Sequence, residues 1–161
     1  MDTTIETLLR MTKTEWDGKS LMGKPLLPTL RDLPLDTVRN VATYEGYSAW
    51  GIALHVLYHK WAMLAVMGGA PRPELYPYEQ ADWPKPPATQ DEASWKELLA
   101  LLEKVHAAYV ATLAAMSPAK LGDEIAAWKC SVCDALETMS HHDLYHVVQI
   151  RNMGLKNLPK A

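Results

Sequence analysis

The chain repeats its apolar residues at the spacing of one helix face, three and four positions apart, over four long stretches. These stretches are residues 3–16, 47–67, 89–116 and 131–153. Three of them end at residues that commonly stop helices, which are Gly18, the pair Gly68–Gly69, and Pro118. An antiparallel four-helix bundle buries four such faces with the fewest elements. The pattern therefore predicts an all-α fold in a single domain, residues 1–161.

Two stretches between the predicted helices are rich in proline and are predicted to be irregular. Residues 21–35 hold three prolines, and there we expect a loop with one or two short turns before a short helix near residues 36–39. Residues 70–88 hold six prolines and three aromatic residues. A loop of this length in a small domain is typical of a lid, a wall or an interface element. Neither a strand pair nor an internal repeat is predicted.

The composition argues against several classes of partner. The 161 residues are 48% hydrophobic, so the chain can bury a core of its own, and its net charge of −3 is spread over mixed signs. This offers no basic surface for nucleic acid or for an anionic membrane. The longest apolar run, residues 61–67, is too short to cross a bilayer, and the first residues do not resemble a signal peptide. The two cysteines, Cys130 and Cys133, favour a reducing, cytoplasmic location.

Candidate chemistry is concentrated in the last predicted helix. Its core-facing stripe is interrupted midway by three polar residues, His142, His146 and Gln149. His142 and His146 are four positions apart, so their imidazoles lie on one helix face about one turn from each other and can point to a single ion. Buried imidazoles cost free energy unless they are satisfied. Either a shared cation or hydrogen bonds to backbone or water would satisfy this pair.

His55 is the candidate for a third ligand. It lies in a part of the second predicted helix that is apolar nearly all round, and facing helices of a bundle bring such side chains together in the core. Three histidines from two helices would leave coordination positions open for water or substrate, an arrangement that zinc, nickel or iron(II) accepts. His59, one turn further along, competes with His55 for the ligand role or serves the pocket beside it.

The remaining candidates have ordinary structural interpretations. His141 lies about 100° around the helix from His142 and is expected at solvent or at an interface. His106 is expected to be structural or exposed, and Asp143 to be a surface acid or a hydrogen-bond partner of a ligand. The two cysteines could form a metal or redox pair. On the same helix, however, the nearer cysteine would lie about 13 Å from His142, so we expect ordinary, partly buried cysteines.

Four motifs follow one another along the chain: Trp16–Leu21, Tyr47–Trp50 leading to His55, Asp82–Pro84, and His142–Ile150. In this order they resemble the DinB-like, or YfiT-like, proteins, which are described as metal-dependent hydrolases, and the resemblance covers nearly the whole chain. One departure is Val148, which stands where a glycine commonly precedes Gln149 and Ile150.

The resemblance implies a four-helix bundle, often dimeric, that holds a divalent metal with His55, His142 and His146. Characterised relatives include thiol S-transferases and an isomerase that use low-molecular-weight thiols. We therefore expect a homodimeric, metal-dependent enzyme of the thiol-transferase or hydrolase type that acts on a small molecule. The alternatives are a non-enzymatic, metal-binding stress-response protein with a structural ion, and a metal-free interaction bundle.

Overall fold

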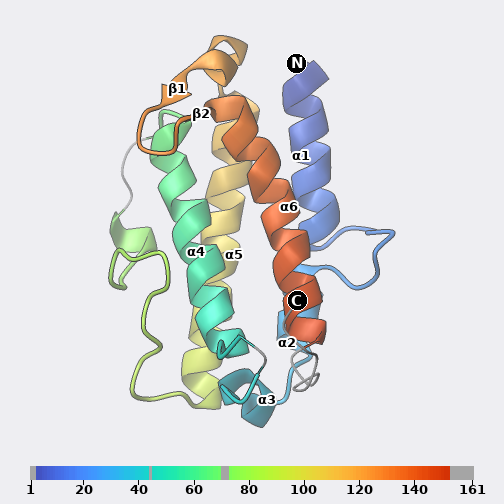
Figure 1. The fold of residues 1–161 in the computed structure, drawn as a ribbon, viewed down its shortest axis with the longest axis vertical. Coiled ribbons are helices and arrows are strands. Elements are labelled where there is room, and N and C mark those ends of the chain that lie inside the picture. The colour runs from blue at the N-terminus through green and yellow to red at the C-terminus, as the bar shows by residue number, and fades with distance from the viewer. Residues whose placement is uncertain (1–2, 44, 70–72, 153–161) are drawn as a thin grey trace.

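The structure is a computed structural model that describes residues 3–43, 45–69 and 73–152. Its regular structure is almost entirely helical, as Figure 1 shows. The long helices are α1 (Thr3–Trp16), α4 (Ala49–Val66), α5 (Glu92–Ala115) and α6 (Val132–Arg151). The short elements are α2 (Leu26–Arg31), α3 (Leu35–Arg39), the 3-10 helices η1 (Pro73–Leu75) and η2 (Pro118–Gly122), and the strands β1 (Glu124–Ile125) and β2 (Cys130–Ser131).

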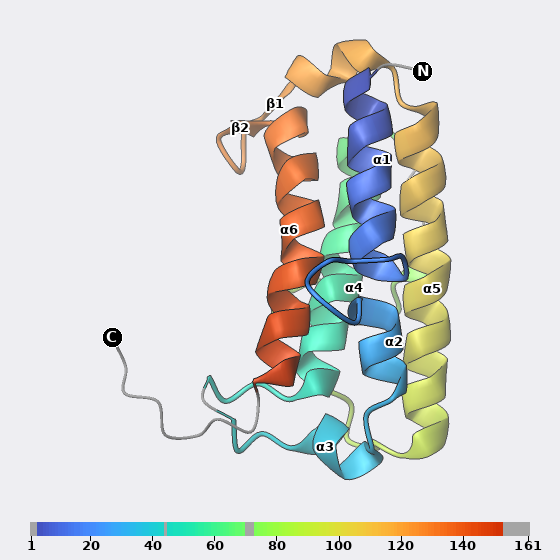
Figure 2. The same ribbon diagram turned by 90° about the vertical axis from the view of Figure 1, so that its right-hand side faces the viewer.

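The four long helices pack side by side as a bundle. α4 lies between α5 and α6, and α1 completes the ring by contacting both α5 and α6. In Figures 1 and 2, α1 and α6 run in one direction and α4 and α5 in the other, because residues 73–91 run back along the bundle before α5 begins. The predicted four-helix bundle is confirmed, and α4 and α6, which carry the candidate histidines, are antiparallel neighbours.

Local hydrogen bonds explain where the helices begin. The Ser131 hydroxyl accepts from the backbone N–H of Asp134 at 3.1 Å, and the Asp134 carboxylate accepts from the N–H of Ser131 at 3.0 Å, which together form a capping box. Asp91 caps α5 in a similar way by accepting from the N–H of Ser94 at 2.8 Å. All four long helices are confirmed, with ends shifted by a few residues. The predicted end of the last helix, Met153, lies outside the described residues.

Two short elements differ from the prediction. The stretch expected to be mostly loop contains the six-residue helix α2, whose Leu26, Leu27 and Leu30 are buried. Pro28 is tolerated because it lies in the first turn, where the backbone N–H has no helical partner. In addition, β1 and β2 pair as an antiparallel hairpin before α6, although no strand pair was predicted. Strands of two residues are too short to produce a visible alternation of apolar and polar positions.

The core surrounds α4, which is buried over most of its circumference. This agrees with its sequence, in which apolar residues occur nearly all round the helix. Within the described residues, α5 is long enough and apolar enough to span a membrane. Helices in the core of a bundle often have the same length and hydropathy. Its residues Leu98, Leu102 and Leu113 are fully buried inside the bundle.

Candidate metal centre

The structure brings His55, His142 and His146 together between α4 and α6. His142 Nε2 lies 2.9 Å from His55 Nε2 and 3.1 Å from His146 Nε2, and one ring nitrogen of each residue lies within 4.8 Å of the other two. His55 and His146 are buried, and His142 is half-buried. Two nitrogen ligands of a tetrahedral zinc ion stand about 3.3 Å apart when each bond is about 2.0–2.1 Å, so the observed spacing suits a shared ion.

The outward nitrogens of two of these rings fix how the rings are protonated. His55 Nδ1 donates to the carbonyl oxygen of Asp82 at 2.6 Å, and His146 Nδ1 donates to Gln149 Oε1 at 2.8 Å. Both rings therefore carry their proton on Nδ1, and both Nε2 lone pairs face His142. A proton on His142 Nε2 can satisfy only one of these neighbours. Three converging nitrogens with so few protons cannot all be satisfied by hydrogen bonds to one another. Their free lone pairs make them good ligands for a cation.

Burial favours the neutral, metal-binding form of all three imidazoles. Desolvation by burial lowers the pKa of His142 to about 2, and the neighbouring histidines add to this effect. Desolvation also lowers the pKa of His146 to about 4, although the hydrogen bond to Gln149 opposes it. The pKa of His55 is lowered as well, chiefly by burial. Neutral imidazole has a free lone pair, so these rings are available as ligands at neutral pH.

The proline-rich segment forms one wall of this cluster. The Trp83 ring stacks on the His55 ring with centroids 4.0 Å apart, and on its other side stacks on Tyr47 at 3.8 Å. The preceding residue, Asp82, supplies the carbonyl that accepts from His55. Residues 70–88 were expected to form a lid, a wall or an interface element. The part of this segment that the structure describes forms a wall over the histidines of the same chain.

His59 lies beside the three histidines and points to a different partner. Its Nε2 is 2.7 Å from Asp82 Oδ1, and His55, His59 and Asp82 form a second group that could hold an ion. That group is the weaker candidate, because the side chain of Asp82 is 65% exposed and the nitrogen of His55 that faces it already donates to a carbonyl. The position of His59 agrees with the predicted role in the neighbouring pocket rather than in the cluster.

A family model described as the DinB superfamily matches residues 22–150, a range that contains all of these side chains. The chain belongs to the DinB superfamily. Neither the search of curated proteins nor the search of solved structures found a match. The resemblance inferred from the four motifs is confirmed, and this DinB protein carries a three-histidine candidate metal site between two antiparallel helices.

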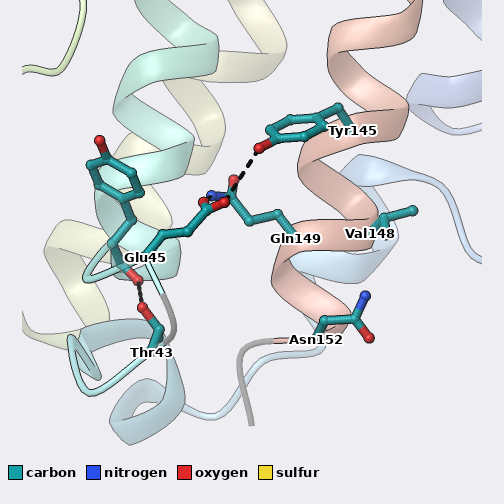
Figure 3. A pocket seen from close by; sticks show the side chains of 7 residues that line it. Thr43, Glu45, Tyr145, Val148, Gln149 and Asn152 are labelled. Carbon is teal, nitrogen blue, oxygen red and sulfur yellow. Dashed lines mark hydrogen bonds between the residues drawn. The ribbon is translucent and has the colours of Figure 1, made fainter. Parts of the chain in front are cut away.

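Sequence reasoning missed the support behind His146 in this DinB protein. Gln149, which accepts from His146, donates through its amide to the carboxylate of Glu45. Tyr145 also donates to Glu45, at 3.5 Å, and Figure 3 shows Tyr145 and Gln149 on α6 pointing toward the Glu45 carboxylate. Nothing in the sequence signals this role for Glu45, since it lies in a loop far from α6 along the chain. Val148 is exposed on the same surface, so replacing the common glycine adds a surface side chain there.

Asp143, His106 and His141 lie in three different environments. Asp143 is buried, 1% exposed, and its carboxylate pairs with Lys60 Nζ at 2.6 Å, so the expectation of a surface acid was wrong. The sequence could not signal this partner, because it lies on another helix. His106 is structural, being buried and stacked on Trp16 with centroids 4.0 Å apart. His141 is exposed, as predicted.

Cys130 lies closer to the histidines than expected. It belongs to β2 rather than to α6, and it lines a pocket that His55, His59 and His142 also line. Because Cys130 does not lie on α6, the separation from His142 expected along one helix does not hold for it. Cys133, which does lie on α6, is partly buried as predicted.

Proposed function

We propose that this DinB protein is a metal-dependent enzyme of the thiol-transferase or hydrolase type, with His55, His142 and His146 holding one divalent ion. The observation that carries the proposal is the convergence of three Nε2 atoms beside a pocket. Zinc, nickel and iron(II) all accept such a nitrogen set. An ion held there would act as a Lewis acid that lowers the pKa of a bound thiol or water.

The surrounding residues have complementary roles in this proposal. The carbonyl of Asp82 and the amide of Gln149 hold two of the imidazoles in the orientation and tautomer that ligation requires. Trp83 covers the face of His55 and excludes water from that side. A substrate would then enter from the pocket on the other side of the cluster.

The position of His59 favours an enzyme over a protein with a purely structural ion. A structural site closes its fourth coordination position with another side chain, whereas a catalytic site leaves one position open. His59 is the nearest candidate for a fourth ligand, but its Nε2 is hydrogen-bonded to Asp82. The alternative, a non-enzymatic metal-binding stress-response protein, requires His59 to turn away from Asp82 and toward the ion.

Metal analysis of protein prepared without an affinity tag tests the site. We expect about one divalent ion per chain, removable by a chelator, and loss of tight binding in the double variant His142→Ala/His146→Ala with most of the helicity retained. His141→Ala is the matched control, because His141 is exposed on the same helix. Unchanged metal binding in the double variant would show that the site is elsewhere.

A substrate panel tests the reaction. The metal-loaded protein is given small thiols with electrophilic acceptors and, separately, simple esters and amides. Thiol conjugation that follows metal content supports the transferase type, and hydrolysis alone supports the hydrolase type. If the metal-loaded protein turns over nothing in the panel, the structural-ion alternative is favoured. A homodimeric state and a cytoplasmic location remain predictions from the sequence and the resemblance.

A further inference from the structure

The pocket beside the three histidines has an uncharged lining. It has a volume of about 360 Å³ and is lined by two members of the cluster, His55 and His142, and by His59, whereas His146 is not part of its lining. The rest of its lining comes from the hairpin and the first half of α6: Trp128, Cys130, Ala135, Thr138 and Met139. None of these side chains is an aspartate, glutamate, lysine or arginine. Apart from the Cys130 thiol and the Thr138 hydroxyl, the polar side-chain groups of this lining are therefore the imidazoles at its histidine end and the indole N–H of Trp128.

The hairpin brings an indole ring to this pocket. The N–H groups of Trp128 and Lys129 both donate to the carbonyl of Ile125, at 2.9 and 2.8 Å, which closes the turn between β1 and β2. Lys129 has φ of 54°, a conformation that few residues adopt, and this reverses the chain directly after Trp128. Trp128 remains 43% exposed, so a large, flat apolar surface lines the pocket without being covered by the protein itself.

The lining selects against a charged substrate body. A charged group that enters the pocket loses hydration and meets no opposite charge among the lining residues, which is unfavourable. A flat apolar group, in contrast, gains by covering Trp128 and Met139. The volume is at the small end of the range for ligand pockets, about 300–1,000 Å³, so the group is of the size of one or two rings.

We infer that the pocket binds an uncharged aromatic group of the substrate against Trp128 and Met139, with a small donor group, such as a thiol, directed at the three histidines. This inference rests on the proposed function, because the donor group is the part that would meet the ion. It assigns Trp128 the role of determining specificity, and it predicts that aromatic thiols are preferred over aliphatic or charged thiols.

Binding of thiols to the cobalt(II)-loaded protein tests the inference without measuring turnover. Cobalt content is measured first, and binding is then followed by the sulfur-to-cobalt absorption band for three probes: benzyl mercaptan, 2-mercaptoethanol and 2-mercaptoethanesulfonate. We expect benzyl mercaptan to bind about tenfold or more tightly than 2-mercaptoethanol, because burying an aromatic ring contributes about that factor. The sulfonate is expected to bind most weakly of the three.

Three variants complete the test. Trp128→Ala should remove most of the preference for benzyl mercaptan, and Trp128→Phe should restore much of it, with cobalt content unchanged in both. Thr138→Trp should exclude the aromatic probe by filling the pocket from an exposed position of α6. The matched control is Glu124→Ala, an exposed residue of the same hairpin, which should leave all three affinities unchanged.

Failure of the inference and failure of the proposed function give different results. If the parent protein takes up no cobalt, the proposed function is wrong, and this inference falls with it. If cobalt binds and the three thiols bind equally, or the sulfonate binds best, the metal site stands and the aromatic subsite is overturned. An unchanged preference in both Trp128→Ala and Thr138→Trp would also overturn it.

Discussion

Helices α4 and α6 carry two polar clusters that are adjacent in sequence but differ in how their charges and lone pairs are satisfied. The first is the histidine cluster of His55, His142 and His146. The second is the ion pair of Lys60 and Asp143, which directly follow His59 and His142 in the chain and are each 1% exposed. Both clusters link the same two helices.

The ion pair satisfies its own charges, whereas the histidines do not satisfy one another. Lys60 Nζ donates to Asp143 at 2.6 Å and lies 5.3 Å from the centroids of both the Trp16 and Tyr109 rings, so its charge is balanced by a carboxylate and two aromatic faces. The histidine cluster turns three acceptor nitrogens toward each other. The other carboxylate oxygen, Asp143 Oδ1, is buried without a hydrogen-bond partner among the described residues, but the two charges are paired. A cluster whose charges balance without a ligand fixes the packing of helices, and one that lacks a positive partner is suited to bind a cation.

The largest expected effect comes from breaking the ion pair. In Lys60→Met, Asp143 keeps its buried position without a counter-charge, and we expect the metal-free protein to lose about 3–5 kcal/mol of its free energy of unfolding. Urea denaturation in the presence of a chelator measures this loss. Lys96→Met is the matched control, since Lys96 forms an exposed pair with Glu92, and a change of at most about 1 kcal/mol is expected there.

The double variant Lys60→Met/Asp143→Leu separates the charge from the packing. Replacing both partners by apolar side chains removes the unpaired charge, so we expect most of the lost stability to return. If the single and double variants are equally unstable, the loss comes from packing around Lys60 rather than from the uncompensated carboxylate. If Lys60→Met is as stable as the parent, the pair does not hold these helices together.

The two clusters also show which parts of the molecule could be predicted from the sequence. Local signals were sufficient for the helices and for the convergence of His142 with His146, because each depends on residues within a turn or two. The pair Lys60–Asp143 spans 83 positions and the pair Glu45–Gln149 spans 104. Such contacts are set by how the helices are arranged in space, which a single sequence does not specify at the level of residue pairs.

A smaller effect is expected from the support of the histidine cluster. Gln149→Leu removes the oxygen that accepts from His146 Nδ1, so the ring is free to rotate and to carry its proton on Nε2. Affinity for a divalent ion should fall about 10- to 100-fold, the usual result of losing a hydrogen bond to a ligand. Isothermal titration of metal into chelator-treated protein measures it.

Asn152→Leu is the control for Gln149→Leu, because Asn152 is exposed at the same end of α6. It should bind the ion as the parent does. Equal affinity in Gln149→Leu and the parent would mean that the orientation of His146 is set by its surroundings and not by this hydrogen bond.

The smallest effect is expected for the protonation of His106. It shows whether the interior around the ion pair of Lys60 and Asp143 excludes a further charge. Burial, with a further contribution from the nearby Lys60, lowers the pKa of His106 to about 2, from the ordinary value of 6.5. Below pH 6.5 the unfolded chain therefore binds a proton that the folded protein does not. The free energy of unfolding should fall as the pH falls, by up to about 1.4 kcal/mol per pH unit for this group, and the effect should be absent above pH 7.

His106→Phe isolates this contribution. Phenylalanine keeps a ring against Trp16, on which His106 stacks at 4.0 Å, but has no proton to gain. Urea denaturation of chelator-treated protein between pH 7 and pH 5 measures the free energy of unfolding against pH. The slope should be smaller in the variant than in the parent, and the difference should correspond to the uptake of about one proton on unfolding. The histidine cluster titrates in both proteins and cancels in the difference. Parallel curves for parent and variant would mean that His106 accepts a proton inside the fold, and that the interior beside Lys60 tolerates a second positive charge.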